Sequence, residues 1–132
     1  MNCKHLILLT IVILLLSCTG KNPGEKLCTT MFAMIEITVK DSLNHPAILD
    51  RFEVLDKNAN QLLPIHPDST LAKEGRYLLL TDSELHYIST LGTLLQFNGF
   101  KNNQNIIQGD YVVTQDGCHI ILVSGDRNLI VK

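Results

Sequence analysis

The sequence predicts an all-β protein that folds as a single β-sandwich of about seven strands. Three observations support this fold class. Apolar and polar residues alternate from residue 28 to residue 40, which is typical of a strand with one buried face. Turn-forming residues recur about every 8 to 12 residues, the spacing of a sandwich built from short strands. The dipeptide Asp116-Gly117 separates two apolar runs, which is a strong hairpin signal.

Two strands are predicted at the start of the domain. Residues 28–40 form the first, and its buried face is expected to consist of alternate apolar residues, namely Met31, Ala33, Ile35, Ile37 and Val39. Residues 41–46 have turn chemistry, and residues 47–55 then resume extended structure with Phe52 and Val54 on one face.

The middle of the chain predicts shorter elements. Residues 56–60 turn the chain into a strand at 61–65, and Pro64 places that strand at a sheet edge because proline has no N–H to donate. Residues 66–75 are predicted to be a loop, and residues 76–80 a short strand.

Residues 81–91 predict one or two helical turns, so we expect a short helix near 83–91. Ser83 with His86 three residues later provides half of a capping box, and three apolar residues have helical spacing, namely Leu85, Ile88 and Leu91. The remainder is strongly β in character, with strands expected at residues 94–100, 106–114, 118–123, 125–128 and 129–131.

The amino-terminal residues 1–17 predict a signal peptide. An apolar run from Leu6 to Leu16 follows the basic residue Lys4, and its eleven residues are too few to cross a bilayer, which takes about 20. The run ends in Leu-Leu-Ser-Cys, which resembles the lipobox of bacterial lipoproteins. The resemblance implies cleavage between Ser17 and Cys18 and attachment of palmitate-type lipid to Cys18. An ordinary cleavage site or an uncleaved anchor is the alternative.

Such a lipoprotein would be held at a membrane of the cell envelope through Cys18. Thr19 follows, where a lipoprotein retained in the inner membrane of many Gram-negative bacteria would have Asp, so the resemblance favours the outer membrane. It leaves open whether the periplasmic or the surface face carries the protein. Residues 18–27 contain glycine, proline and charged residues and predict a tether of at most about 35 Å, which leaves residues 28–132 as the β-sandwich domain.

The cysteines predict a disulfide within the domain. Cys3 would leave with the signal peptide and Cys18 would carry lipid, so Cys28 and Cys118 remain in an oxidising compartment. Two buried free thiols are the alternative. Removing residues 1–17 also shifts the formal net charge from −2 to −3, and an acidic chain without a basic run lacks the charge pattern of a nucleic-acid-binding protein.

Two segments carry a family resemblance. VKDSLNHPAILDRFEV, at residues 39–54, looks like the opening hairpin of carboxypeptidase-regulatory or transthyretin-like domains, which are Ig-like β-sandwiches. FNGF at 97–100 and CHIILVSG at 118–125 resemble small bacterial lipoproteins of uncharacterised function. The regulatory-like domains usually have Gly before the Pro, where this chain has Asn44-His45. An antibody-type domain is excluded, because Tyr111 lies seven residues before Cys118 and there is no Trp.

The residues with catalytic or ligand-binding chemistry form no complete motif. Four histidines outside the signal peptide lack the close spacing of metal ligands: His45, His66, His86 and His119. Cys118 and His119 are adjacent on a strand, so they point to opposite faces and cannot form a nucleophile pair. The turn at 56–60 begins like a calcium loop but lacks the required Gly and Glu further on.

Asp50 shares a strand face with apolar neighbours, so we expect it to be buried and to accept a hydrogen bond from a turn backbone; a catalytic carboxylate is the alternative. The sequence as a whole predicts a non-enzymatic, lipid-anchored envelope protein without a cofactor or metal. It would present its sandwich as a binding, assembly or accessory module, and its partner would be another envelope protein. The alternative is a small-ligand or metal-binding periplasmic protein that uses His45, His66 or the turn at 56–60. The oligomeric state stays open.

Overall fold

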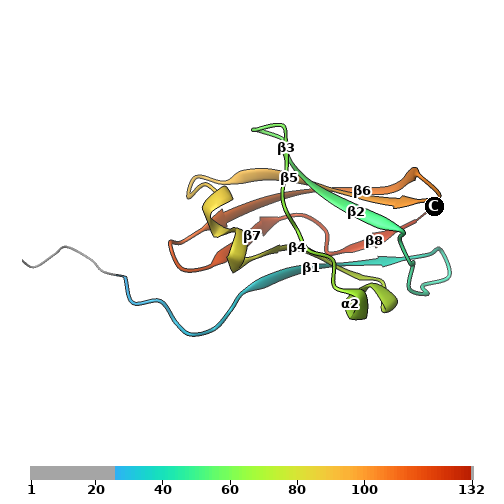
Figure 1. Cartoon of the computed structure of the whole chain (residues 1–132), viewed down its shortest axis with the longest axis horizontal. Coiled ribbons are helices and arrows are strands. Elements are labelled where there is room, and N and C mark those ends of the chain that lie inside the picture. The colour runs from blue at the N-terminus through green and yellow to red at the C-terminus, as the bar shows by residue number, and fades with distance from the viewer. Residues whose placement is uncertain (1–25, 132) are drawn as a thin grey trace, which may run out of the picture.

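The computed structural model describes residues 26–131, which form two packed β-sheets (Figure 1). The elements in chain order are β1 (Met34–Lys40), β2 (Arg51–Asp56), β3 (Gln61–Leu62), α2 (Ser69–Lys73), β4 (Arg76–Thr81), the 3₁₀ helix η1 (Asp82–Tyr87), β5 (Thr93–Lys101), β6 (Gln104–Gln115), β7 (Ile120–Ser124) and β8 (Asn128–Ile130). One sheet has the order β4-β1-β8 and the other β3-β2-β5-β6-β7. The predicted all-β sandwich is confirmed, and within residues 26–131 no helix is long and apolar enough to cross a membrane.

The core lies between the two sheets. Strand β1 contributes Ile35, Ile37 and Val39, each at most 3% exposed, so the predicted alternation holds within the strand. The facing sheet contributes Val54, Leu95, Phe97, Tyr111 and Val113. β1 pairs antiparallel with β4 and parallel with β8, while all pairs in the five-stranded sheet are antiparallel. The short β3 lies at a sheet edge, as Pro64 predicts.

Three aromatic rings join the two sheets near the start of β2. Phe52 packs edge-on against Tyr77, with ring centroids 5.5 Å apart, and stacks on Phe97 at 5.6 Å. The Tyr77 hydroxyl donates to the carbonyl of Ala47 and accepts from the N–H of Leu49. The segment before β2 is therefore fixed to β4 by a buried hydroxyl that has both of its hydrogen bonds.

The first strand is shorter than predicted. It begins at Met34 rather than at residue 28, and Met31 is 77% exposed instead of buried. The reason is that the N–H of Ala33 donates to the Asp82 side chain rather than to a neighbouring strand. Residues before Met34 thus run along the end of the sandwich without joining a sheet.

The helical segments correct two predictions. Residues 66–75 are not entirely a loop, because Asp68 caps the helix α2 by accepting from the N–H groups of Thr70 and Leu71. The predicted turns near 83–91 are present as η1, but the capping box is formed by Thr81 and Glu84 rather than by Ser83 and His86. The helix ends at Tyr87, so Leu91 is 97% exposed and does not extend the apolar face.

Tyr111 fixes the loop between β7 and β8. Its ring is buried, and its hydroxyl donates to the carbonyl of Asp126 at 2.7 Å. Gly125 has φ +127° and packs directly on the ring, since a Cβ there would lie 2.2 Å from Tyr111 Cδ1. Gly109 also lies against the hydroxyl end of the ring. Tyr111, whose spacing from Cys118 served in the sequence only to exclude an antibody-type domain, therefore positions the chain as it enters β8.

Candidate functional site

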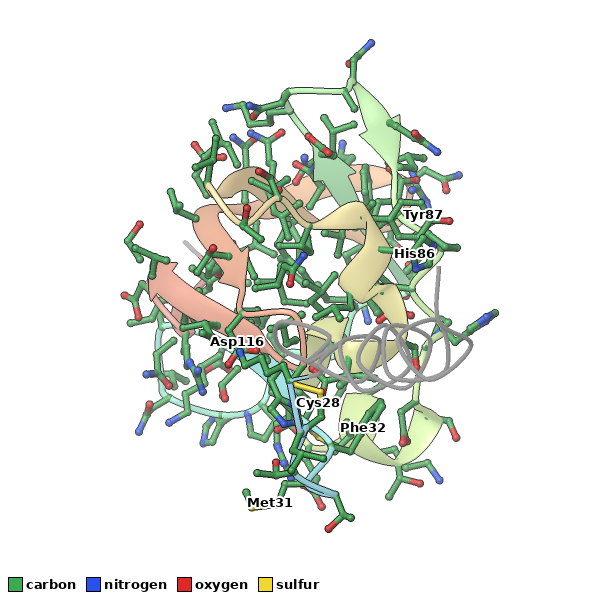
Figure 2. The ribbon with its side chains drawn as sticks, turned by 90° about the vertical axis from the view of Figure 1, so that its left-hand side faces the viewer. Cys28, Met31, Phe32, His86, Tyr87 and Asp116 are labelled. Atoms are coloured by element: carbon green, nitrogen blue, oxygen red, sulfur yellow. A yellow bond between two sulfur atoms is a disulfide. The ribbon has the colours of Figure 1, made fainter. Side chains whose placement is uncertain are left out.

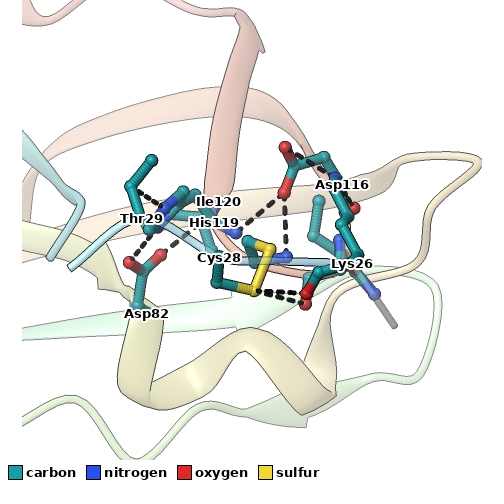
Figure 3. The surroundings of a disulfide bond; sticks show 10 residues. Lys26, Cys28, Thr29, Asp82, Asp116, His119 and Ile120 are labelled. Atoms are coloured by element: carbon teal, nitrogen blue, oxygen red, sulfur yellow. Dashed lines mark hydrogen bonds and ion pairs between the residues drawn. A yellow bond between two sulfur atoms is a disulfide. The ribbon is translucent and has the colours of Figure 1, made fainter. Parts of the chain in front are cut away.

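The described chain enters the sandwich beside a disulfide. Cys28 and Cys118 are bonded, with 5.3 Å between their Cα atoms (Figure 3). The predicted pairing is confirmed, and the alternative of two free thiols is wrong. Cys118 lies immediately before β7, so the bond ties the entering segment to the edge strand of the five-stranded sheet.

An ion pair flanks the disulfide. Lys26 Nζ lies 3.0 Å from Asp116 Oδ2 and also donates to the Asp116 carbonyl. Asp116 Oδ1 accepts from the N–H groups of His119 and Cys118, both at 2.9 Å. These backbone hydrogen bonds, together with Lys26, hold the pKa of Asp116 well below its usual value. The lowered pKa favours the charged form of Asp116, which faces Lys26.

On the other side of the disulfide lies a chain of three polar side chains. Asp82 Oδ2 accepts from His119 Nδ1 at 2.7 Å, and His119 Nε2 lies 2.8 Å from Thr29 Oγ1. A carboxylate can only accept, so the proton of a neutral His119 is on Nδ1, and Nε2 then accepts from the Thr29 hydroxyl. The side chains of Asp82 and His119 are only 11% and 23% exposed.

Asp82 is the centre of this network. Besides His119 it accepts from the N–H groups of Ala33 at 2.8 Å and Ile120 at 2.9 Å, which belong to the entering segment and to β7. Burial acts to raise the pKa of Asp82, but the hydrogen bonds from Ala33, His119 and Ile120 outweigh it, and the pKa lies below its usual value. The carboxylate therefore holds three separate segments together in its charged form.

We call these residues the entry clamp: Lys26, Cys28, Thr29, Ala33, Asp82, Asp116, Cys118 and His119. Between its fastened positions the clamp leaves apolar side chains exposed, with Leu27 at 94%, Met31 at 77% and Phe32 at 57%. A shallow, mainly apolar pocket of about 220 Å³ lies beside it, lined by Thr29, Met31, Phe32, Ala33 and His119. Figure 2 faces this end of the molecule and shows Met31 and Phe32 beside the disulfide at Cys28.

Sequence reasoning found only the disulfide of this site. Cys118 and His119 were expected on a strand, but β7 begins only at Ile120, so both residues lie in the bend before it, where Cys118 is bonded to Cys28. The actual partners of His119 are Thr29 and Asp82, which are distant in sequence, and no spacing rule connects them. The one local signal was Asp82 in the first turn of a short helix, which does not indicate what its carboxylate binds.

The other candidate residues are separated. His45 lies in the turn after β1, where its Nδ1 is 3.3 Å from Asp41 Oδ2. The turn at 56–60 follows the far end of β2, where Asp56 accepts from the N–H groups of Asn58 and Ala59. These two turns thus lie at opposite ends of β2 (Figure 1), and residues 26–131 contain no group of three potential metal ligands. His66 is exposed in the segment between β3 and α2.

Asp50 differs from its prediction in burial. Its side chain is 51% exposed rather than buried, because β2 begins only at Arg51. It does accept from a turn backbone, the N–H of Asn102 at 2.7 Å, and it lies 3.5 Å from Lys101 Nζ. The pKa of Asp50 is lowered, chiefly by the hydrogen bond from Asn102, which is the opposite of a catalytic acid with a raised pKa.

A second concave surface lies between β6 and β8, at the open side of the sandwich. It has a volume of about 490 Å³ and is lined by Ile106, Ile107, Gln108, Asp126, Asn128, Leu129 and Ile130. The predicted cleavage site at Ser17 and lipidation site at Cys18 lie outside the described residues.

Comparison with known proteins adds no relative: no family model, no curated protein and no solved structure matches the chain.

Proposed function

We propose that the protein is a lipid-anchored component of the bacterial cell envelope that presents a β-sandwich as a non-enzymatic binding, assembly or accessory module. Lipid on Cys18 would hold it to a membrane, with the outer membrane favoured by Thr19. The lipobox-like Leu-Leu-Ser-Cys and the polar segment after it support the anchor. The confirmed disulfide fits the oxidising compartment that such a protein would occupy. The resemblance to small bacterial lipoproteins supports the same assignment.

The observation that carries this proposal is the entry clamp. With Lys26 fixed to the sandwich, the domain lies at most about 29 Å from Cys18, which is the fully extended length of eight residues. If the clamp were absent and the first fixed residue were Met34, this limit would be about 58 Å. Fastening residues 26–33 to the sandwich thus halves the distance over which the domain can move from its anchor. The clamp would thereby keep the domain within a smaller maximum distance of the membrane.

The experiment is to replace the lipidated cysteine in cells. A Cys18→Ala variant should lose incorporation of an alkyne-labelled fatty acid and should leave the membrane fraction, while a Cys3→Ala variant should keep both properties. Density-gradient separation of inner and outer membranes then tests the role of Thr19. If the Cys18→Ala variant still carried label and still sedimented with membranes, the anchor proposal would be wrong.

The ligand or metal alternative required the turns that carry His45 and residues 56–60 to lie at one end of the sandwich. They lie at opposite ends of β2, which argues against a ligand or metal site formed by both turns.

A second candidate function is ester hydrolysis, and one observation favours it. Asp82, His119 and Thr29 have the order and hydrogen-bond distances of an acid, a base and a hydroxyl nucleophile. His119 would take the Thr29 proton as the hydroxyl attacks an ester carbonyl and return it to the leaving alcohol, after which water would release the acid. A fluorophosphonate probe tests this, because only a reactive Thr29 forms an adduct that is lost in Thr29→Val and kept in Thr30→Val. If mass spectrometry finds no adduct, the network has a structural role only.

A further inference from the structure

The entry clamp holds three large apolar side chains in water. Its fastened positions are residues 26, 28, 29 and 33, and between them Leu27, Met31 and Phe32 are more than half exposed. A flexible segment could fold such side chains onto the domain, but this segment is held by a covalent bond, an ion pair and hydrogen bonds at Lys26, Thr29 and Ala33. The clamp therefore keeps these side chains exposed; Met31 and Phe32 line one pocket, and Leu27 lies in the same clamped segment, next to Cys28. Large apolar side chains held in water on one segment indicate a contact surface.

We propose that Leu27, Met31 and Phe32 form a membrane-contact site that inserts into the surface of the bilayer carrying the Cys18 lipid. This inference rests on the proposed function, because it takes the lipid anchor as given and names what the adjoining surface touches. Leu27 has a branched aliphatic side chain, Met31 a thioether and Phe32 an aromatic ring. Side chains of these kinds bind at the boundary between lipid headgroups and acyl chains.

The position of the site in the chain selects the bilayer as its occupant. Lys26 is eight residues from Cys18, and eight residues span at most about 29 Å even when fully extended. The clamped segment thus lies within reach of the membrane surface. The opposite end of the seven-residue β1 lies about 20 Å beyond this segment, measured along the strand. Of the described surface, this end is the part that the anchor brings nearest to lipid.

Weak insertion is sufficient in an anchored protein. A short flexible linker gives its two ends an effective concentration on the order of millimolar, so contacts too weak to recruit a free domain are occupied when the domain is tethered. Charge attraction would contribute little, because Lys26, the basic residue of the segment, is paired with Asp116 and the processed chain is acidic overall. The contact would therefore depend on apolar insertion and vary little with salt.

The pocket beside the segment fits the same ligand class. Its walls include Met31, Phe32 and Ala33, and its volume of about 220 Å³ can take part of an acyl chain. Thr29 and His119 also line the pocket, but they are hydrogen-bonded to each other, and His119 is bonded to Asp82 as well. The surface open to a ligand is accordingly apolar.

Membrane contact at this end would fix which surface is presented. The turn after β1 and the turn between β5 and β6 both lie at the opposite end (Figure 1), and the β5–β6 turn is bonded to the segment that leads into β2, where Asp50 accepts from Asn102 and Lys101 donates to the carbonyl of Ile48. These turns, at residues 41–46 and 101–104, would point away from the membrane and would be the surface offered to a partner.

A tryptophan reporter tests the site cleanly, because the chain contains no tryptophan. Phe32→Trp and Leu27→Trp place the reporter in the proposed site, and Leu43→Trp places it in the turn after β1, where Leu43 is 74% exposed. Each full-length, processed protein is reconstituted into phosphatidylcholine–phosphatidylglycerol vesicles with or without brominated lipid. All three positions are largely exposed, so the melting temperatures should stay close to that of the wild type.

We expect blue-shifted emission and quenching by brominated lipid for Phe32→Trp and Leu27→Trp, and neither for Leu43→Trp. If the lipidated protein binds vesicles but all three reporters remain unquenched, the contact site is wrong and the anchor stands. The same holds if a blue shift appears without quenching and disappears on dilution, since a second copy of the chain would then cover the site. If mass spectrometry finds no lipid on Cys18 and no variant binds vesicles, both the contact site and the anchor are wrong.

Discussion

Removing the disulfide should destabilise the domain without abolishing its fold. The bond joins residues separated by 90 positions, and the chain-entropy relation assigns about 4 to 5 kcal/mol to a loop of this length. Cys28 lies on a segment outside both sheets, so the folded Cys28→Ser/Cys118→Ser variant can release residues 26–33 and regain backbone freedom. This freedom offsets part of the loss, and we expect the free energy of unfolding to fall by about 2 to 4 kcal/mol.

Urea denaturation monitored by circular dichroism measures this change. The double variant should unfold at lower urea, and its slope m should rise, because an unfolded chain without the cross-link exposes more surface. Wild-type protein with a reductant in the urea series should reproduce the variant and serves as the control for the substitutions themselves. An unchanged midpoint would refute the entropic reasoning. Loss of the β signal in the absence of urea would refute the placement of Cys28 outside the folding core.

Three further predictions concern single positions. Asp82→Asn should lower the free energy of unfolding at pH 7. Because the folded-state pKa of Asp82 is below 3.8, the extra stability of the wild type should be lost as the pH falls below about 4. Urea denaturation of both proteins at pH 7 and pH 3 should show the difference in their free energies of unfolding becoming smaller at pH 3. Gly125→Ala should cost more than Gly117→Ala, since both positions have positive φ but only the Cβ at Gly125 overlaps Tyr111; equal urea midpoints would contradict the packing. Leu79→Ala should cost about 2 to 5 kcal/mol, because Leu79 is fully buried, and a change below about 1 kcal/mol in the same assay would place it outside the core.

The fold class could be predicted because it depends on a local pattern. Ile35, Ile37 and Val39 alternate with polar residues, and a strand turns such residues to one face whatever surrounds it. The strand boundaries were harder to predict from the sequence, since the start of β1 at Met34 depends on which group accepts from the N–H of Ala33. That acceptor, Asp82, is 49 residues away.

The sequence alone determined the β-sandwich and the pairing of Cys28 with Cys118, because these depend on short-range pattern and on counting one residue type. Lipidation at Cys18 stays a prediction. The tertiary structure decided the entry clamp and the exposure of Leu27, Met31 and Phe32. The polar groups of the clamp come from the entering segment, η1 and the turn between β6 and β7, which meet only when the sheets pack. An alternating sequence predicts that one face of a strand is buried. Only the packed structure shows that β1 begins at Met34, so that the alternating residues before it lie outside the sheet and Met31 is exposed.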